Sequence, residues 1–176
     1  MKRIHIFDFD GTLINTPLPE EGKRKYEELR GEKYPHKGWW GREESLLPEY
    51  DYPAVQEVHD AYHKAVEDGD IVILQTNRLP KLKLHIDRIL GLYKMKFDYK
   101  FYQDGRSKSD RLVHAVNMVL ADDLSLDDTD MEELGEDELE IIVWEDMKEH
   151  IDDFHTLHDR YPNINIKINH IKQDRK

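Results

Sequence analysis

The sequence alternates short apolar runs with stretches in which apolar residues recur every three or four positions. The runs at 71–74 and 141–144 are apolar throughout, which is typical of parallel strands covered on both faces. Strands are predicted, in chain order, at 4–7, 71–74, 97–101, 141–144 and, as an edge strand, 164–168. Helices are predicted at about 54–69, 82–91, 112–120 and 147–161. This alternation predicts an α/β fold, a Rossmann-like parallel sheet with helices on both faces.

The stretch 15–53 departs from this alternation, because it is rich in proline and shows no sustained periodicity beyond one short helical segment near 21–30. It also holds the triplet Gly38-Trp39-Trp40. Two roles are open for the tryptophans: anchoring the loop in the core, or covering the site and stacking on a base. A stretch this short does not build a large cap domain. We therefore expect one domain over 1–176, with a short cap or loop insertion and an open site.

The acidic residues are concentrated in one segment. The formal net charge is −12, from 38 Asp+Glu against 26 Lys+Arg. Residues 121–140 hold 11 of the acids and no Lys or Arg, which leaves 27 acids against 26 bases elsewhere. Because residues 78–111 are net basic, the acidic total does not exclude a nucleic-acid partner. The segment 121–140 is interpreted as a solvated acidic insertion, or alternatively as an interaction segment that repels polyanions from one side.

Three simple features bear on the compartment. The absence of cysteine excludes disulfides, thiol nucleophiles and thiolate metal sites. No apolar run approaches the roughly 20 residues that a membrane span needs. The chain passes from Met1-Lys2-Arg3 directly into the first predicted strand, without an apolar signal region. We expect a cytoplasmic protein with no membrane partner.

Polar residues follow four of the predicted strands where each strand ends. In an open α/β sheet, ligands bind beyond the carboxyl ends of the strands, so these residues are candidates for one shared site. They are Asp8, Asp10, Gly11 and Thr12 after the first strand, Thr76, Asn77 and Arg78 after the second, Lys108 after the third, and Glu145 and Asp146 after the fourth.

The residue types at these strand ends indicate phosphoryl chemistry. Asp8 and Asp10 repel each other if they lie close together, so a divalent cation is expected between them. Oxygen-only ligation favours Mg²⁺ over zinc. One carboxylate can attack phosphorus to form an aspartyl-phosphate, while the other protonates the leaving oxygen and later deprotonates water. Thr76, backbone N–H groups and a lysine would hold the phosphoryl oxygens.

Three of the strand ends resemble motifs of haloacid dehalogenase (HAD) superfamily phosphohydrolases. The matching segments are FDFDGTL at 7–13, ILQTNR at 73–78 and VWED at 143–146. The resemblance implies that Asp8 is the nucleophile and Asp10 the general acid/base. It also implies that Thr76 binds the phosphoryl group and that Glu145 or Asp146 completes the Mg²⁺ shell.

The third motif of that superfamily needs a lysine or arginine. Lys108 fits best, because its segment lies just before a predicted helix, and Lys100 and Arg111 are rivals. The expected site has Asp8, Asp10 and Lys108 as catalytic residues, Gly11, Thr12, Thr76, Asn77 and Arg78 as substrate-binding residues, and Asp8, Asp10, Glu145 and Asp146 as Mg²⁺ ligands.

Two narrower resemblances concern the substrate. Residues 76–78 and 106–110 are similar to segments of the phosphatase domain in polynucleotide kinase/phosphatases, although Met147 replaces an arginine of that group. The GWW triplet at 38–40, together with residues 145–150, resembles Swiss Army Knife RNA repair-like HAD domains. Both imply a nucleotide or a polynucleotide phosphate end as substrate. The alternatives are a small-molecule phosphatase and a non-catalytic HAD-fold module that binds a protein through its acidic segment.

Overall fold

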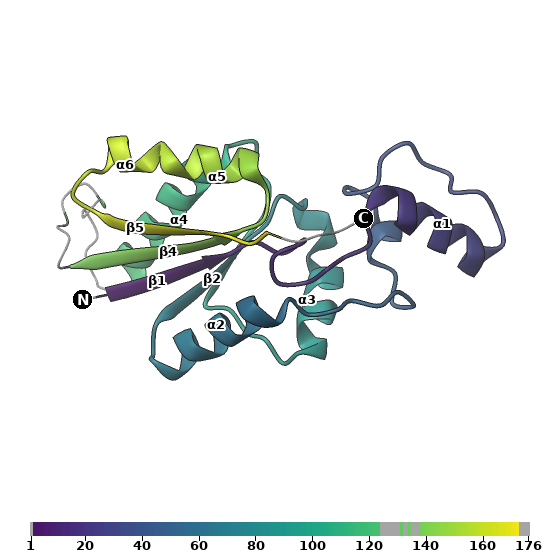
Figure 1. The fold of residues 1–176 in the computed structure, drawn as a ribbon, viewed down its shortest axis with the longest axis horizontal. Helices are drawn as coiled ribbons and strands as arrows, with labels where there is room; N and C mark the ends of the chain where they lie inside the picture. The colour runs from purple at the N-terminus through teal and green to yellow at the C-terminus, as the bar shows by residue number, and fades with distance from the viewer. Residues whose placement is uncertain (1, 124–130, 132–133, 135–137, 173–176) are drawn as a thin grey trace.

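The computed structural model describes residues 2–123, 131, 134 and 138–172, and its centre is one parallel sheet. The strands are β1 (Lys2–Phe7), β2 (Ile71–Gln75), β3 (Tyr99–Phe101), β4 (Leu139–Glu145) and β5 (Asn165–His170). They lie in the order β3-β2-β1-β4-β5, and each neighbouring pair is parallel (Figure 1). The predicted α/β class is confirmed, and β5 does lie at an edge of the sheet.

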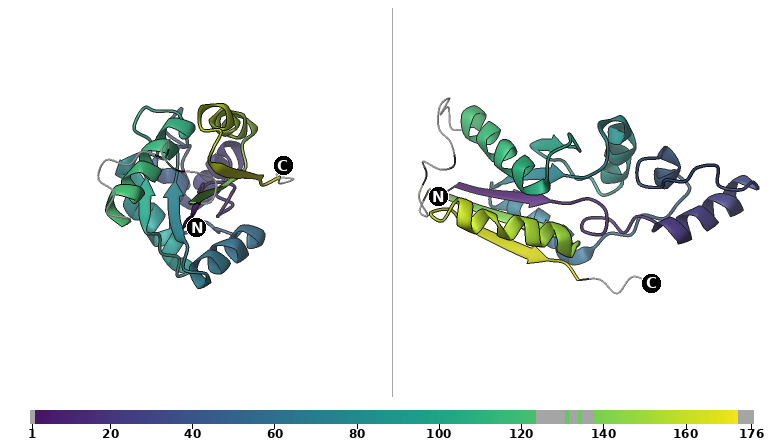
Figure 2. Two further views of the ribbon diagram at one scale, coloured as in Figure 1. Left: turned by 90° about the vertical axis from the view of Figure 1, so that its left-hand side faces the viewer. Right: turned by 90° about the horizontal axis from the view of Figure 1, so that it is seen from above.

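Helices cover both faces of the sheet, as expected (Figures 1 and 2). One face carries α2 (Gln56–Glu67) and α3 (Lys83–Leu92), and the other carries α4 (Lys108–Asp123), α5 (Lys148–His155) and α6 (Leu157–Arg160). The chain order explains the two layers. After β1 the chain adds β2 and then β3 on one side of β1. It then crosses to the other side of β1 and adds β4 and β5. Right-handed crossovers therefore place the two sets of helices on opposite faces.

The central strands are buried on both sides. In β2, Val72 and Leu74 belong to the core beneath α2 and α3, whereas Ile71 and Ile73 belong to the core beneath α4 to α6. This division follows the period of two in a strand. It explains why the sequence of β2 is apolar at successive positions rather than at alternate ones.

The stretch 15–53 forms a small cap beyond the carboxyl ends of the strands (Figures 1 and 2). It contains α1 (Pro19–Arg30) and a 3-10 helix, η1 (Glu43–Leu46). The predicted helix near 21–30 is therefore present and longer than expected. It begins at a proline, whose fixed φ suits the first turn, and its last turn is closed by Gly31 at φ +68°.

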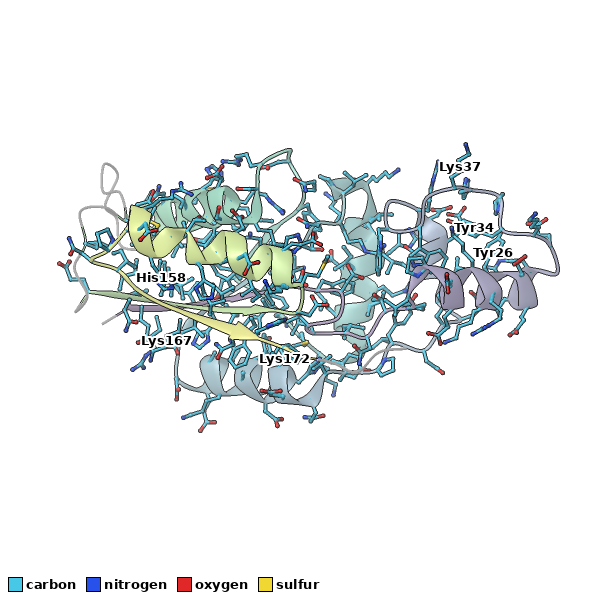
Figure 3. All side chains as sticks on the ribbon, turned by 45° about the horizontal axis from the view of Figure 1, so that its top comes forward. Tyr26, Tyr34, Lys37, His158, Lys167 and Lys172 are labelled. Atoms are coloured by element: carbon cyan, nitrogen blue, oxygen red, sulfur yellow. The ribbon has the colours of Figure 1, made fainter. Side chains whose placement is uncertain are left out.

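Trp39 anchors this cap. Its side chain is buried, and its indole N–H donates to the Pro17 carbonyl at 2.9 Å. The indole lies so close to Gly22 that a Cβ there would stand 2.0 Å from a ring carbon, so only glycine fits. Tyr26 and Tyr34, labelled in Figure 3, extend the aromatic cluster with ring centroids 5.4 Å apart.

The remaining differences from the sequence prediction are local. The helix expected at 147–161 is interrupted at Thr156, whose hydroxyl donates to the Asp153 carbonyl at 2.6 Å, giving α5 and α6. A second 3-10 helix, η2 (Pro80–Leu82), precedes α3. Most of the acidic segment 121–140 lies outside the described residues, but Met131 and Leu134 are buried in the core beside α4. None of the helices in the described ranges has both the length and the apolar character of a membrane span.

Candidate active site

The predicted polar residues lie at the carboxyl ends of the strands, and several of them line one cavity. Asp8 directly follows β1, Thr76 directly follows β2, Lys108 is the first residue of α4, and Glu145 is the last residue of β4. The cavity has a volume of about 460 Å³, and its lining includes residues of the cap. It is lined by Asp8, Asp10, Leu18, Trp40, Asn77, Arg78, Lys108, Asp146, Met147 and His150.

A buried lysine bridges two carboxylates at the floor of this cavity. The Lys108 ammonium donates to Asp8 Oδ1 at 2.8 Å and to Glu145 Oε2 at 2.6 Å. Burial favours a lower pKa for Lys108, but the two carboxylates outweigh it and the pKa is raised. Burial likewise favours a higher pKa for Glu145, but Lys108 and then His150 outweigh it and lower the pKa. Lys108 and Glu145 thus form a charged buried pair.

The three candidate cations for the third motif, Lys100, Lys108 and Arg111, have different partners in the structure. Lys100 instead pairs with Asp87 at 2.7 Å, where both side chains are partly exposed. The Arg111 guanidinium is buried beneath the loop after β2, and it donates to the Thr76 carbonyl at 2.7 Å. Of the three, Lys108 alone contacts Asp8.

Negative charge is in excess at the same place. Carboxylate oxygens of Asp8, Glu145 and Asp146 all lie within 4.8 Å of one another. Three carboxylates against the one ammonium of Lys108 leave two surplus negative charges. Burial, then repulsion from Glu145, raises the pKa of Asp8 well above its usual range, and burial also raises the pKa of Asp146. An all-oxygen cluster with this surplus fits a hard divalent cation of the Mg²⁺ type.

The turn after β1 places Thr12 over this cluster. Gly11 adopts φ +73°, and its N–H donates to the Ile14 carbonyl at 2.8 Å, which closes the turn. The Thr12 hydroxyl then lies 3.1 Å from Asp8 Oδ2 and 3.3 Å from Asp146 Oδ1. A glycine is needed for the positive φ, since a residue with a Cβ would be strained there.

Asp10 does not join the three clustered carboxylates. Both of its oxygens accept from Arg78, at 2.9 and 2.7 Å, and the Thr16 hydroxyl donates to it at 2.6 Å. Burial favours a higher pKa for Asp10, but the Arg78 guanidinium outweighs it and the pKa is lowered. In this arrangement Asp10 is a carboxylate.

Arg78 connects Asp10 to the cap. Its remaining guanidinium contacts are to the Trp40 carbonyl at 2.7 Å and to the Ser45 hydroxyl at 2.5 Å. The guanidinium also lies over the Trp40 ring, 5.0 Å from its centroid. Arg78 is buried, and these partners already engage most of its donors.

A chain of side chains holds Glu145 from the other side. Arg111 donates to the Asn77 side-chain oxygen, which leaves the Asn77 NH₂ to donate to His150 Nε2 at 3.0 Å. His150 Nε2 is then an acceptor, so its proton lies on Nδ1 and is donated to Glu145 Oε1 at 3.0 Å. The tautomer is assigned from this hydrogen-bond network.

Some residues that shape the site carry no motif that sequence reasoning can read. Gln75 donates to the Lys108 carbonyl at 2.8 Å, and Asp153 accepts from the Ser109 N–H at 2.8 Å, so both fix the start of α4. Ser45 is a third example, since nothing in its local sequence indicates contact with Arg78. The Ser107 hydroxyl caps the same helix, since it accepts from the Asp110 N–H at 3.2 Å.

Comparison with known proteins adds evidence for the fold. No protein-family model matches the sequence, and a search of curated proteins finds no relative. Solved structures do match. Part of a Pnkp1/Rnl/Hen1 complex is 15% identical with a TM-score of 0.50, over 98% of this chain and 47% of that chain. The chain thus spans about half the length of that protein.

Two further matches cover most of both chains. A Thermotoga maritima protein described as a beta-phosphoglucomutase is 20% identical with a TM-score of 0.55, over 100% of this chain and 89% of that one. CbbY from Rhodobacter sphaeroides, solved in complex with phosphate, is 14% identical with a TM-score of 0.50. The match covers 100% of this chain and 90% of that one. At these identities the likeness concerns the fold alone: this chain shares the fold of these proteins.

Proposed function

We propose that this protein is a Mg²⁺-dependent phosphomonoester hydrolase that forms an aspartyl-phosphate on Asp8. The supporting observation is the buried cluster in which Asp8, Glu145 and Asp146 converge and Lys108 contacts two of them. A nucleophilic carboxylate needs an adjacent positive charge when it approaches a phosphate dianion. This cluster supplies one such charge from the chain and has room in its charge balance for a divalent cation.

Each residue then has a chemical role. A carboxylate oxygen of Asp8 attacks phosphorus, and a new P–O bond forms as the ester P–O bond breaks. Lys108 offsets charge on Asp8 and on the transferred phosphoryl group. Bound to Asp8, Glu145 and Asp146, Mg²⁺ would supply the remaining positive charge to the phosphoryl oxygens. Thr76, which directly follows β2, is the residue expected to donate to a phosphoryl oxygen.

Asp10 serves as the general acid and then as the general base. Because Asp10 is a carboxylate while Arg78 holds it, it first takes up a proton from solvent. It gives that proton to the leaving oxygen, and later it takes a proton from the water that hydrolyses the aspartyl-phosphate. Because Arg78 holds both Asp10 oxygens in this structure, the carboxyl has to change partner before it can reach the leaving oxygen. The contacts of Arg78 with the cap make the cap segment part of that change.

For the substrate we favour a nucleotide or a polynucleotide phosphate end. Support comes from the segments at 76–78 and 106–110, which resemble those of polynucleotide kinase/phosphatases. The likeness of the fold to part of the Pnkp1/Rnl/Hen1 complex agrees with that choice. The cavity volume of about 460 Å³ suits a ligand of nucleotide size.

Two experiments test the proposal. Hydrolysis of an aryl phosphate is measured with Mg²⁺ and with EDTA, for the wild type and for Asp8→Asn. Activity that needs Mg²⁺ and is lost in Asp8→Asn is expected, and full activity in the variant would show that Asp8 is not the nucleophile. Asp87→Asn is a matched control, because Asp87 pairs with Lys100 outside the cavity.

The second experiment compares 3′-phosphorylated oligonucleotides, mononucleotides and sugar phosphates. The alternative of a small-molecule phosphatase is favoured by the likeness to a protein described as a beta-phosphoglucomutase, and it predicts fastest turnover of the sugar phosphates. Mg²⁺ binding without turnover of any of these compounds would favour a non-catalytic binding module.

A further inference from the structure

The two adjacent tryptophans of the cap have opposite environments. Trp39 is 3% exposed in the cap core, whereas Trp40 is 41% exposed and lines the cavity. We propose that Trp40 is a stacking platform for a planar ring of the substrate, a nucleobase attached to the phosphate that reaches Asp8. This inference rests on the proposed function and specifies the substrate class of the same site.

The Trp40 ring is held in a fixed orientation. One face lies against the Arg78 guanidinium, with its carbon 5.0 Å from the ring centroid, and the same guanidinium donates to the Trp40 carbonyl. Asp10 binds that guanidinium through both oxygens, so its plane is fixed as well. Because Arg78 lies over one face, a planar ring of the ligand would stack on the opposite face of the indole.

The lining of the cavity includes two kinds of residue that suit the two parts of a nucleotide. Asp8, Asp146 and Lys108 are the charged residues to which the phosphoryl chemistry is assigned. Leu18, Trp40 and Met147 add apolar surface to the lining, and Met147 is 45% exposed. A phosphate or a sugar phosphate gives that surface no apolar partner. A flat ring stacks on an indole and also packs against a thioether.

The charges of the cavity favour a ring over further phosphates as the second recognised group. Among the described residues that line the cavity, the lysines and arginines are Lys108 and Arg78, and both are bonded to carboxylates. A site that followed a polynucleotide backbone would need more cations along the groove. The volume of about 460 Å³ lies within the usual range for a small-molecule site and far exceeds the space that one phosphate needs.

The test measures binding without turnover. In the Asp8→Asn protein, calorimetry with Mg²⁺ compares adenosine 3′-monophosphate and adenosine 5′-monophosphate with ribose 5-phosphate. At least one of the adenosine phosphates should bind about tenfold to hundredfold more tightly, which is the usual contribution of one base stacked on an aromatic side chain. Adding Trp40→Leu should remove this difference, and adding Trp40→Phe should preserve most of it. Leu84→Ala, at an exposed position outside the cavity lining, is the control.

Two results would overturn the inference. One is equal affinity for ligands with and without the base. The other is an equal loss of affinity for both kinds of ligand in Trp40→Leu, because Trp40 would then act only through Arg78. The Trp40→Phe variant keeps the test valid if Trp40→Leu folds poorly. Aryl phosphate turnover by the wild type is scored separately, so a failed ring preference with intact Mg²⁺-dependent turnover refutes the platform and leaves the hydrolase proposal standing.

Discussion

Replacement of Lys108 by methionine isolates the charge balance on which the site depends. Methionine has a similar length but no charge, so Lys108→Met leaves Asp8 and Glu145 facing each other without their shared ammonium. The side chains of Lys108, Asp8 and Glu145 are 2%, 9% and 1% exposed, so water screens their repulsion little. Removing one partner of a buried ion pair costs about 3–5 kcal/mol, and we expect a loss of this size in the free energy of unfolding at pH 7 with EDTA.

The pH dependence of the variant gives a second measurement. The pKa of Asp8 is already raised in the folded protein, chiefly by burial, and loss of Lys108 raises it further. The folded variant therefore binds a proton that the unfolded chain does not bind between the two pKa values. Its stability should be full below the ordinary pKa of aspartate and should fall as the pH rises through the folded value. The deficit relative to wild type should thus shrink when the pH is lowered from 7 to 5.

Mg²⁺ supplies a third measurement with the same two proteins. Without Lys108 the surplus of negative charge in the cluster grows from two to three, so Mg²⁺ should bind more tightly and should stabilise the variant more than the wild type. Urea unfolding with and without Mg²⁺ measures the gain. Lys100→Met is the matched control, because the pair between Lys100 and Asp87 is exposed and such pairs contribute about 0.2–1 kcal/mol. A loss in Lys108→Met no larger than that of the control would refute the argument.

Three further predictions test other contacts. His150→Leu should weaken Mg²⁺ binding about tenfold to hundredfold by calorimetry, since Glu145 loses a hydrogen-bond partner, whereas His155→Leu, an exposed position on the same helix, should not. Gly22→Ala should cost about 1–3 kcal/mol in urea unfolding through the clash with Trp39, and Gly38→Ala, whose Cβ would meet nothing within 4 Å, should cost much less. Asp10→Asn should destabilise the protein at pH 7 but less at pH 3, because the lowered pKa of Asp10 means that its contribution is lost on acidification; an equal deficit at both pH values would contradict this.

The fold was predictable because its strongest constraint is local in the sequence. Strands buried on both faces need apolar residues at successive positions, and β2 and β4 show such runs in the chain itself. The bounds of individual helices were less predictable from the sequence. The helix expected near 147–161 divides at Thr156 through one hydroxyl hydrogen bond to a backbone carbonyl, and a period of 3.6 residues carries no information about such a contact.

The position of the site was predictable for a related reason, since parallel strands carry their carboxyl ends to one edge of the sheet. Asp8, Lys108 and Glu145 meet there because Asp8 directly follows β1, Glu145 ends β4, and Lys108 begins α4. The pairing of the charged side chains within the site was not predictable from the sequence. Asp8 and Asp10 are two positions apart and were expected to share a cation, yet Asp10 pairs with Arg78.

That separation has a physical origin in the cap. Arg78 is buried, and a buried guanidinium is stable only when a carboxylate and several acceptors surround it. The cap offers the Trp40 carbonyl and the Ser45 hydroxyl, and Asp10 supplies the negative charge. The partner of Asp10 is thus decided by residues about 30 and 70 positions away in sequence, through contacts that exist only after the cap has packed over the strand ends. The motif therefore places both aspartates just after β1, whereas the packing of the cap decides that the second of them pairs with Arg78.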